Sequence, residues 1–278
     1  QALDEAIEYY MLHPYLELPE DLAKLVFQGT DEDTRQALVE SLSAFAEKPP
    51  SSLVEREHQQ EKLDRLAHQG LDGLRNNAFF KYGFVPESMT ALGLFCHMFL
   101  HGGLGHIIGN LLILFLAGPF IEDVWGRPLY AGFYLLSGVV AAMSWALAHP
   151  GLNTPMIGAS GAIAGVMGAF LVRHFSSRIR FFYMVGFFWR GTFFAPAWLM
   201  LPLWFGEQLL MFLMVQGAGA GGGGGVAYMA HIGGFGFGAI AALAIRKARI
   251  EERFISGAIN AKITVVDNKV IDDAMVHA

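Results

Sequence analysis

Apolar and polar residues are distributed very unevenly along this chain of 278 residues. The region before residue 90 is rich in Glu, Asp, Lys and Arg, whereas the remainder contains long apolar stretches separated by short polar or Gly- and Pro-rich breaks. Five such stretches cover Leu104–Phe120, Leu129–Leu147, Ala159–Leu171, Ala195–Val215 and Ala227–Ile245. Four of them have the length, ~17–25 residues, that a helix needs to cross a bilayer. The pattern therefore predicts an all-α, polytopic bundle of membrane helices.

The third stretch is too short to span a bilayer in the usual way. It follows the segment HPGLNTPMIG, whose Pro150, Gly151 and Pro155 break helices. Irregular backbone survives at membrane depth only where it is buried in protein or lines a water-filled cavity. We therefore expect Ser160 to begin a helix partway into the membrane.

Basic residues predict the orientation of the spans, because loops on the cytoplasmic side carry an excess of Lys and Arg. The breaks after the first, third and fifth stretches hold Arg127, Arg173, Arg178, Arg180, Arg190, Arg246, Lys247 and Arg249. The alternate loops, 149–158 and 216–225, contain no Lys or Arg. Residues 1–103 and Ser160 are thus predicted to face the extracytoplasmic side, and residues 248–278 to form a cytoplasmic tail.

Composition supports a membrane protein and adds little about its partners. Hydrophobic residues make up 54% of the chain and charged residues 16%, with a formal net charge of -6. We predict contact with the lipid bilayer and no nucleic acid. The single cysteine, Cys96, excludes an internal disulfide and is interpreted as a packing residue. Because no earlier span could export the N-terminal region, we also expect a transmembrane helix upstream of Gln1.

Residues 1–80 are predicted to form an extracytoplasmic helical region. Thr30 with Asp33, and Ser52 with Glu55, resemble capping boxes, and Gly70 is a plausible helix stop. Apolar packing along this helix is assigned to Leu63, Leu66 and Leu74. Near the C-terminus, KITVVDNKVI predicts a small hairpin turning at residues 267–268, and the glycine-rich segment 217–227 predicts a loop.

Polar residues within membrane spans are costly and usually face a cavity or a partner. The candidates are His97, His101, His106, Asn110, Glu122, Ser160, Glu207, Gln208 and His231. Small residues follow two of them at helical spacing, and such spacing lets membrane helices approach closely: Gly161, Gly165 and Gly168 after Ser160, and Gly234, Gly238 and Ala242 after His231. If these two helices pack together, the serine and the imidazole become a nucleophile and its base; packing alone is the alternative.

His106 and Asn110 lie four residues apart and therefore share one face of a helix. Together with the backbone N–H of Ser160 they could form an oxyanion hole. A competing interpretation makes His97, His101 and His106 metal ligands. We favour no metal, because no Cys or acidic residue accompanies them and Gly102-Gly103 interrupts the helical spacing; packing at a helix end is then the role of His97 and His101.

Four pieces of the sequence together resemble the rhomboid family of intramembrane serine proteases, of the bacterial type. They are HGGLGHIIGNL, Glu122 soon after it, GASG at 158–161 and AHIGGFGFG at 230–238, in the order of the family. The similarity covers residues 79–247 and includes FFKYGFVPE before the first stretch. It implies a rhomboid-like membrane core over 81–247, whose five spans would be helices two to six of six.

The resemblance also implies roles for single residues. Ser160 would be the nucleophile and His231 the general base of a dyad without a carboxylate. His106, Asn110 and the Ser160 backbone N–H would bind the oxyanion, while Glu122, Gly158, Gly161, Gly234 and Gly238 would be structural. The substrate would be the transmembrane helix of another protein, hydrolysed through an acyl-enzyme without a cofactor, in a bacterial inner membrane. The sequence predicts no oligomeric state.

Two features need a specific interpretation. The family commonly has an arginine two residues after the glutamate, but this chain has Val124 there, and Arg127 is the candidate to replace it in anchoring the first loop. Glu207 and Gln208 lie on the fourth span, which resembles the mobile gate helix of the family. We expect structural hydrogen bonding from both rather than contact with substrate.

Two other classes of protein remain possible on the sequence. A non-catalytic rhomboid-like protein that binds membrane clients typically loses the serine or the histidine, and this chain keeps both. A channel or transporter would favour internal repeats with paired broken helices, and neither GASG nor the histidine segment has a second copy.

Overall fold

A computed structural model describes residues 2–27, 30–43, 46–185, 189–217 and 226–251. The chain divides into two compact units, which we call the N-terminal unit and the core unit. The N-terminal unit comprises residues 1–100, 145–157 and 211–227, and the core unit comprises residues 101–144, 158–210 and 228–278. The predicted hairpin near residue 267 and most of the predicted glycine-rich loop lie outside the described residues.

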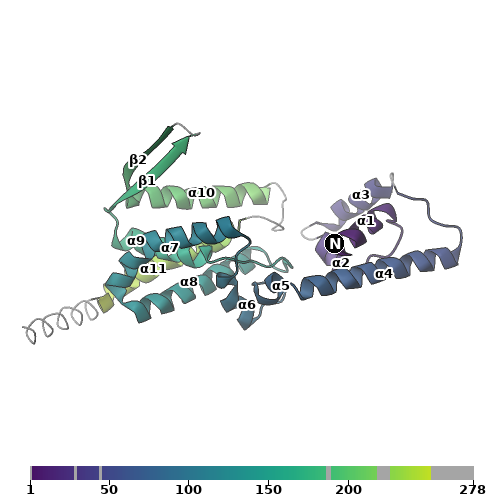
Figure 1. Cartoon of the computed structure of the whole chain (residues 1–278), viewed down its shortest axis with the longest axis horizontal. Helices are drawn as coiled ribbons and strands as arrows, with labels where there is room; N and C mark the ends of the chain where they lie inside the picture. Colours follow the sequence, from purple (N-terminus) through teal and green to yellow (C-terminus); the bar gives the residue numbers. More distant parts are fainter. Residues whose placement is uncertain (1, 28–29, 44–45, 186–188, 218–225, 252–278) are drawn as a thin grey trace, which may run out of the picture. The chain divides into compact units, whose positions relative to one another are not determined.

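Short helices and one long helix build the N-terminal unit (Figure 1). They are α1 (Ala2–Leu12), α2 (Glu20–Val26), α3 (Glu32–Ser43), α4 (Leu53–Arg75), α5 (Ala78–Tyr82), α6 (Ala91–Cys96) and the 3-10 helix η1 (His97–Phe99). Leu63 of α4 is fully buried with Tyr10, Leu16 and Phe27, and Leu66 packs beside it against a second cluster around Leu22. The helical prediction for this region is confirmed, and so is the packing of Leu63 and Leu66.

Two predicted helix boundaries are wrong. Asp31, rather than Thr30, precedes α3, and its carboxylate accepts a hydrogen bond from the Thr34 N–H at 2.8 Å. Gly70 does not stop α4, because the glycine is buried against the backbone of Leu3 in α1, and the helix continues to Arg75. This glycine therefore allows a close contact between α4 and α1 and does not mark a helix end.

The core unit contains the apolar helices predicted from the sequence (Figure 1). They are α7 (Leu104–Trp125), α8 (Arg127–Ala148), α9 (Ser160–Arg173), α10 (Ala197–Gly217) and α11 (Tyr228–Lys247), of which α8 and α10 run on into residues of the N-terminal unit. Within the described residues, α7, α8, α10 and α11 are long and apolar enough to cross a membrane, and α9 is shorter. The protein is therefore an integral membrane protein with a polytopic helical bundle, as predicted.

The connection between α9 and α10 was predicted only as a basic loop. It forms an antiparallel hairpin of β1 (Arg178–Val185) and β2 (Trp189–Pro196), in which Phe181 pairs with Phe193 and Arg180 with Phe194. In Figure 1 the hairpin slants away from the start of α10 and lies above that helix in the view. The aromatic rings of Phe181 and Phe193 stack with their centroids 5.4 Å apart.

Small residues bring α9 and α11 into backbone contact at the centre of the core unit. A Cβ added at Gly238 would overlap the carbonyl oxygen of Gly165, and one at Gly234 would overlap that of Gly161. On the opposite face of α9, a Cβ at Gly161 would lie 2.5 Å from that of Ala141 in α8. Glycine is therefore required at these positions for helices to meet at this distance, as the small-residue pattern predicts.

Candidate active site

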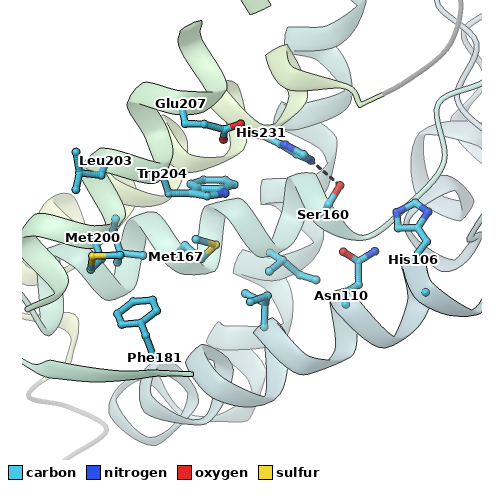
Figure 2. Close-up of a pocket in the computed structure, with 15 residues that line it drawn as sticks. His106, Asn110, Ser160, Met167, Phe181, Met200, Leu203, Trp204, Glu207 and His231 are labelled. Atoms are coloured by element: carbon cyan, nitrogen blue, oxygen red, sulfur yellow. Dashed lines mark hydrogen bonds between the residues drawn. The ribbon is translucent and has the colours of Figure 1, made fainter. Parts of the chain in front are cut away.

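Ser160 and His231 face each other across the interface between α9 and α11 (Figure 2). The serine Oγ and the histidine Nε2 are 2.8 Å apart, which is a hydrogen-bond distance. Ser160 is the first residue of α9, and His231 lies in the first turn of α11. The imidazole is 9% exposed and the serine is half-buried. The backbone contact between these helices thus brings together the two residues that the sequence singled out.

The start of α9 leaves backbone donors next to the serine hydroxyl. The first intrahelical bond runs from the Ile163 N–H to the Ala159 carbonyl, at 3.0 Å. The N–H groups before it have no partner within the helix, and the helix dipole adds partial positive charge there. Gly158 precedes this turn with φ 121°, a conformation that L side chains rarely adopt. A helix beginning at Ser160 was predicted, and the structure has it.

His106 and Asn110 approach the same place from α7 (Figure 2). His106 Nδ1 accepts a 3.4 Å hydrogen bond from the Gly102 N–H, so its Nε2 carries the proton and is a donor. A Cβ at Gly158 would lie 2.7 Å from that Nε2 and 3.8 Å from Asn110 Nδ2. Asn110 Nδ2 is buried, and it has no hydrogen-bond partner among the described residues. Two side-chain donors therefore converge beside the start of α9.

A third helix, α10, contacts the other side of the imidazole. His231 Nδ1 lies 2.6 Å from Gln208 Oε1, and the amide of Gln208 also donates to the carboxylate of Glu207. The Trp204 ring is tilted against the imidazole at a centroid distance of 5.9 Å. The sequence predicted structural hydrogen bonding for Gln208 without naming its partner, and Trp204 carried no signal. Which helix lies against the polar side of α10 is decided by packing and not by its pattern.

A cavity of about 800 Å³ extends from the serine and histidine between α7, α9 and α10. Its lining is Gly105, His106, Gly109, Asn110, Ile113, Ser160, Ile163, Met167, Phe181, Met200, Leu201, Leu203, Trp204, Glu207 and His231. In Figure 2 the polar side chains gather at one end, and Met167, Met200, Leu203 and Phe181 lie toward the other. The cavity therefore offers apolar space continuous with a small polar site, which suits an extended peptide with apolar side chains.

The remaining candidate residues make other contacts. His97 is buried in the N-terminal unit, its Nδ1 lies 3.1 Å from the Gly93 carbonyl, and burial lowers the pKa of its imidazole. His101 packs edge-on against the ring of His106, at 5.0 Å between centroids. Across the described residues, no three His, Cys, Asp or Glu side chains gather as metal ligands would. Glu122 forms an ion pair with Arg127, with 3.3 Å between carboxylate oxygen and Nε.

The fold and these residues define a polytopic membrane protein with a serine–histidine pair inside its helical core. The rhomboid domain matches residues 89–248, which is more than half of the chain, and the chain therefore belongs to the rhomboid family.

Three curated proteins illustrate the similarity. The rhomboid protease GluP of Bacillus subtilis is 27% identical over 173 residues, covering 60% of this chain and 30% of GluP. YdcA, a candidate rhomboid protease of the same strain, is 33% identical over 72 residues, covering 26% of this chain and 36% of YdcA. RHOMBOID-like protein 5 of Arabidopsis thaliana is 31% identical over 74 residues, covering 27% of this chain and 24% of that protein. The match thus spans about a third or less of the length of these relatives.

Proposed function

We propose that this protein is an intramembrane serine endopeptidase in which Ser160 and His231 form the catalytic dyad. The observation that carries the proposal is the 2.8 Å contact between Ser160 Oγ and His231 Nε2 at the polar end of an apolar cavity. Membership of the rhomboid family and relatives named as proteases support it. No cofactor is required by this chemistry.

The proposed reaction has two halves. Ser160 Oγ attacks the carbonyl carbon of the scissile bond while His231 Nε2 accepts the hydroxyl proton, and the imidazolium then protonates the leaving amine. This gives an acyl-enzyme and a free amine. Water attacks the ester with His231 again taking a proton, which returns to Ser160 Oγ as the carboxylic acid leaves. Atoms and charge balance without any other reactant.

Charge on the tetrahedral oxyanion needs donors that are already in place. Asn110 Nδ2 and His106 Nε2 supply two, and the Ser160 backbone N–H at the start of α9 supplies the third. The unpartnered amide of Asn110 supports this role, because a buried donor without a partner is costly and is retained where it serves a ligand or a transition state. Gly158 gives the His106 ring the room it occupies.

The remaining residues have structural roles in this proposal. Gly234 and Gly238 keep α9 and α11 at backbone contact, which sets the distance between nucleophile and base, and Gly161 makes room for Ala141 of α8. Glu122, with Arg127, ties the end of α7 to the start of α8. None of these five residues takes part in the chemistry.

The proposed substrates are other membrane proteins, cut in or near a transmembrane segment. Apolar lining next to the dyad suits the side chains of such a segment once it is unwound. The bias of Lys and Arg supports a dyad on the extracytoplasmic side, and the similarity to two bacterial proteins supports a bacterial membrane as the location.

Proteolysis in liposomes tests the proposal. Wild-type protein is reconstituted with a panel of single-span fusion proteins that carry small and helix-weakening residues near one end of the span, and cut sites are identified by mass spectrometry. We expect cleavage by wild type and none by Ser160→Ala. Ser144→Ala is the matched control, because that hydroxyl donates to the Val140 carbonyl of its own helix and the residue does not line the cavity. Equal cleavage by wild type and Ser160→Ala would overturn the dyad, and binding without cleavage would favour a client-binding protein.

A further inference from the structure

Gln208 occupies an unusual position for an amide in an apolar membrane helix. It is 6% exposed, and both polar atoms of its side chain are engaged. Its Oε1 lies 2.6 Å from Nδ1 of His231, and its Nε2 donates to the carboxylate of Glu207. Burying an amide without partners would cost about 1–3 kcal/mol, so these two contacts account for its presence there.

The contact with Gln208 decides which imidazole nitrogen of His231 carries the proton. A glutamine carbonyl oxygen only accepts hydrogen bonds, so the Nδ1 facing it must be the donor. In a neutral imidazole the other nitrogen is then unprotonated. That nitrogen, Nε2, is the one that faces Ser160 Oγ and has to accept its proton.

Glu207 fixes the orientation of the Gln208 amide. A carboxylate accepts hydrogen bonds, so it holds the NH2 end of the amide and leaves the carbonyl end for His231. If the amide were reversed, its NH2 would face Nδ1 and would select the opposite tautomer, in which Nε2 carries the proton. Glu207 and Gln208 are neighbours on α10, so this orientation is built into one turn of a single helix.

We infer that Gln208 is a positioning residue that holds His231 in the tautomer able to deprotonate Ser160, with Glu207 orienting its amide. This inference rests on the proposed protease function. Gln208 touches neither substrate nor nucleophile and acts through His231. During the reaction both ring nitrogens become donors, and the Gln208 oxygen keeps the ring in place while Nε2 passes the proton on.

The first test compares two variants with the same incoming side chain. Gln208→Met removes the acceptor with little change in length, and Leu209→Met places the same side chain one position further, at a residue that is 41% exposed. We measure the second-order rate of fluorophosphonate labelling in liposomes. Gln208→Met should lower the rate about 10- to 100-fold, the range found when the partner that orients a metal-binding histidine is removed. The labelling rate of Leu209→Met should stay within about twofold of the wild-type rate, because substitution of an exposed side chain that makes no special contact usually has little effect.

A second variant separates positioning from packing. The double variant Glu207→Gln with Gln208→Glu keeps an acceptor against His231 Nδ1 and supplies an amide donor to the new carboxylate, so it should label at a rate near that of wild type at alkaline pH. The acidic limb of its pH–rate profile should move upward by about one pH unit or more, because a nearby carboxylate favours the imidazolium. The other polar groups around His231 in the cavity are Ser160 of α9 and His106 and Asn110 of α7, and all are unchanged in this variant. An unshifted profile would overturn the inference.

A spectroscopic measurement keeps the inference testable apart from activity. Nitrogen-15 spectra of labelled histidine, with the His231 signals assigned by difference from His231→Gln, show directly which ring nitrogen is protonated. We expect protonated Nδ1 and bare Nε2 in wild type, and a mixture of tautomers in Gln208→Met. Protonated Nε2 in wild type would overturn the inference. Absence of labelling in a wild type with protonated Nδ1 would instead count against the proposed protease function.

Discussion

Two helices contact the candidate histidine in very different ways. α9 meets α11 backbone to backbone, through glycines that leave no room for a single Cβ. α10 meets α11 through large side chains, with Trp204 and Phe205 packed on Phe235 at 5.9 and 5.1 Å between ring centroids. A Cβ added at Gly206 of α10 would touch nothing within 4 Å.

The difference shows which interface fixes the distance between Ser160 and His231 and which one can repack. Backbone contact allows almost no sliding, because packed interiors do not deform smoothly, so Ser160 and His231 are held at a fixed distance. Side-chain contact can repack at moderate cost. The tight interface therefore carries the reacting pair, and the looser one carries Gln208 and Trp204, which contact the histidine from outside that pair.

The largest expected effect comes from closing the space between α9 and α11. Gly234→Leu forces a branched side chain into the carbonyl of Gly161, and we expect loss of folded protein in detergent, measured by size-exclusion chromatography and thermal unfolding. Gly206→Leu is the matched control on α10 and should elute as wild type does. Equal behaviour of the two variants would show that the contrast between the interfaces is not real.

Removal of an oxyanion donor should leave the fold intact and slow the chemistry. Asn110→Ala deletes the amide that has no partner among the described residues, and should lower the rate of peptide cleavage about 10²- to 10³-fold. His106→Ala should do the same. Thermal unfolding of both variants checks that stability is unchanged. A rate within a factor of two of wild type would remove these residues from the proposed site.

The end of α9 remote from the dyad offers a smaller test of the tight interface. Glu251 follows α11 and binds both the Trp125 indole at 2.9 Å and Arg173 of α9 at 3.0 Å. Glu251→Gln keeps the size but removes the charge, and should destabilise the protein by roughly 1–2 kcal/mol, since Arg173 is a third exposed and partly screened by solvent. The midpoint of thermal unfolding measures this. No change in midpoint would show that the contact does not secure the interface.

The weakest expected effect lies at the first loop. Arg127 pairs with Glu122 but is 92% exposed, and such exposed pairs contribute at most about 1 kcal/mol. Arg127→Gln should therefore change the thermal midpoint by no more than a few degrees. A large drop would mean that Arg127 anchors the loop more firmly than its contact with Glu122 indicates.

The sequence predicted the tight interface better than the loose one. Glycines at spacings of four on two apolar stretches favour a close approach, which predicted the pairing of α9 with α11, and the Pro- and Gly-rich segment before the short third stretch predicted the start of α9 at Ser160. Gly70 was wrongly predicted to end a helix, because glycine occurs both at helix ends and where a second helix packs closely against the first. The partner of Gln208 was not predictable, since the two polar residues of α10 mark an inward-facing position but not the helix that lies against it. The β hairpin was missed because aromatic residues in β1 do not alternate with polar ones.

Covalent labelling of the membrane-embedded protein with a fluorophosphonate probe, followed by mass spectrometry of its peptides, tests the central claim most directly. An activated serine forms a stable adduct, and the account predicts that the adduct lies on Ser160, is absent from Ser160→Ala and is lost from folded His231→Ala. An adduct on another residue, or undiminished labelling in His231→Ala, would contradict a Ser160–His231 dyad.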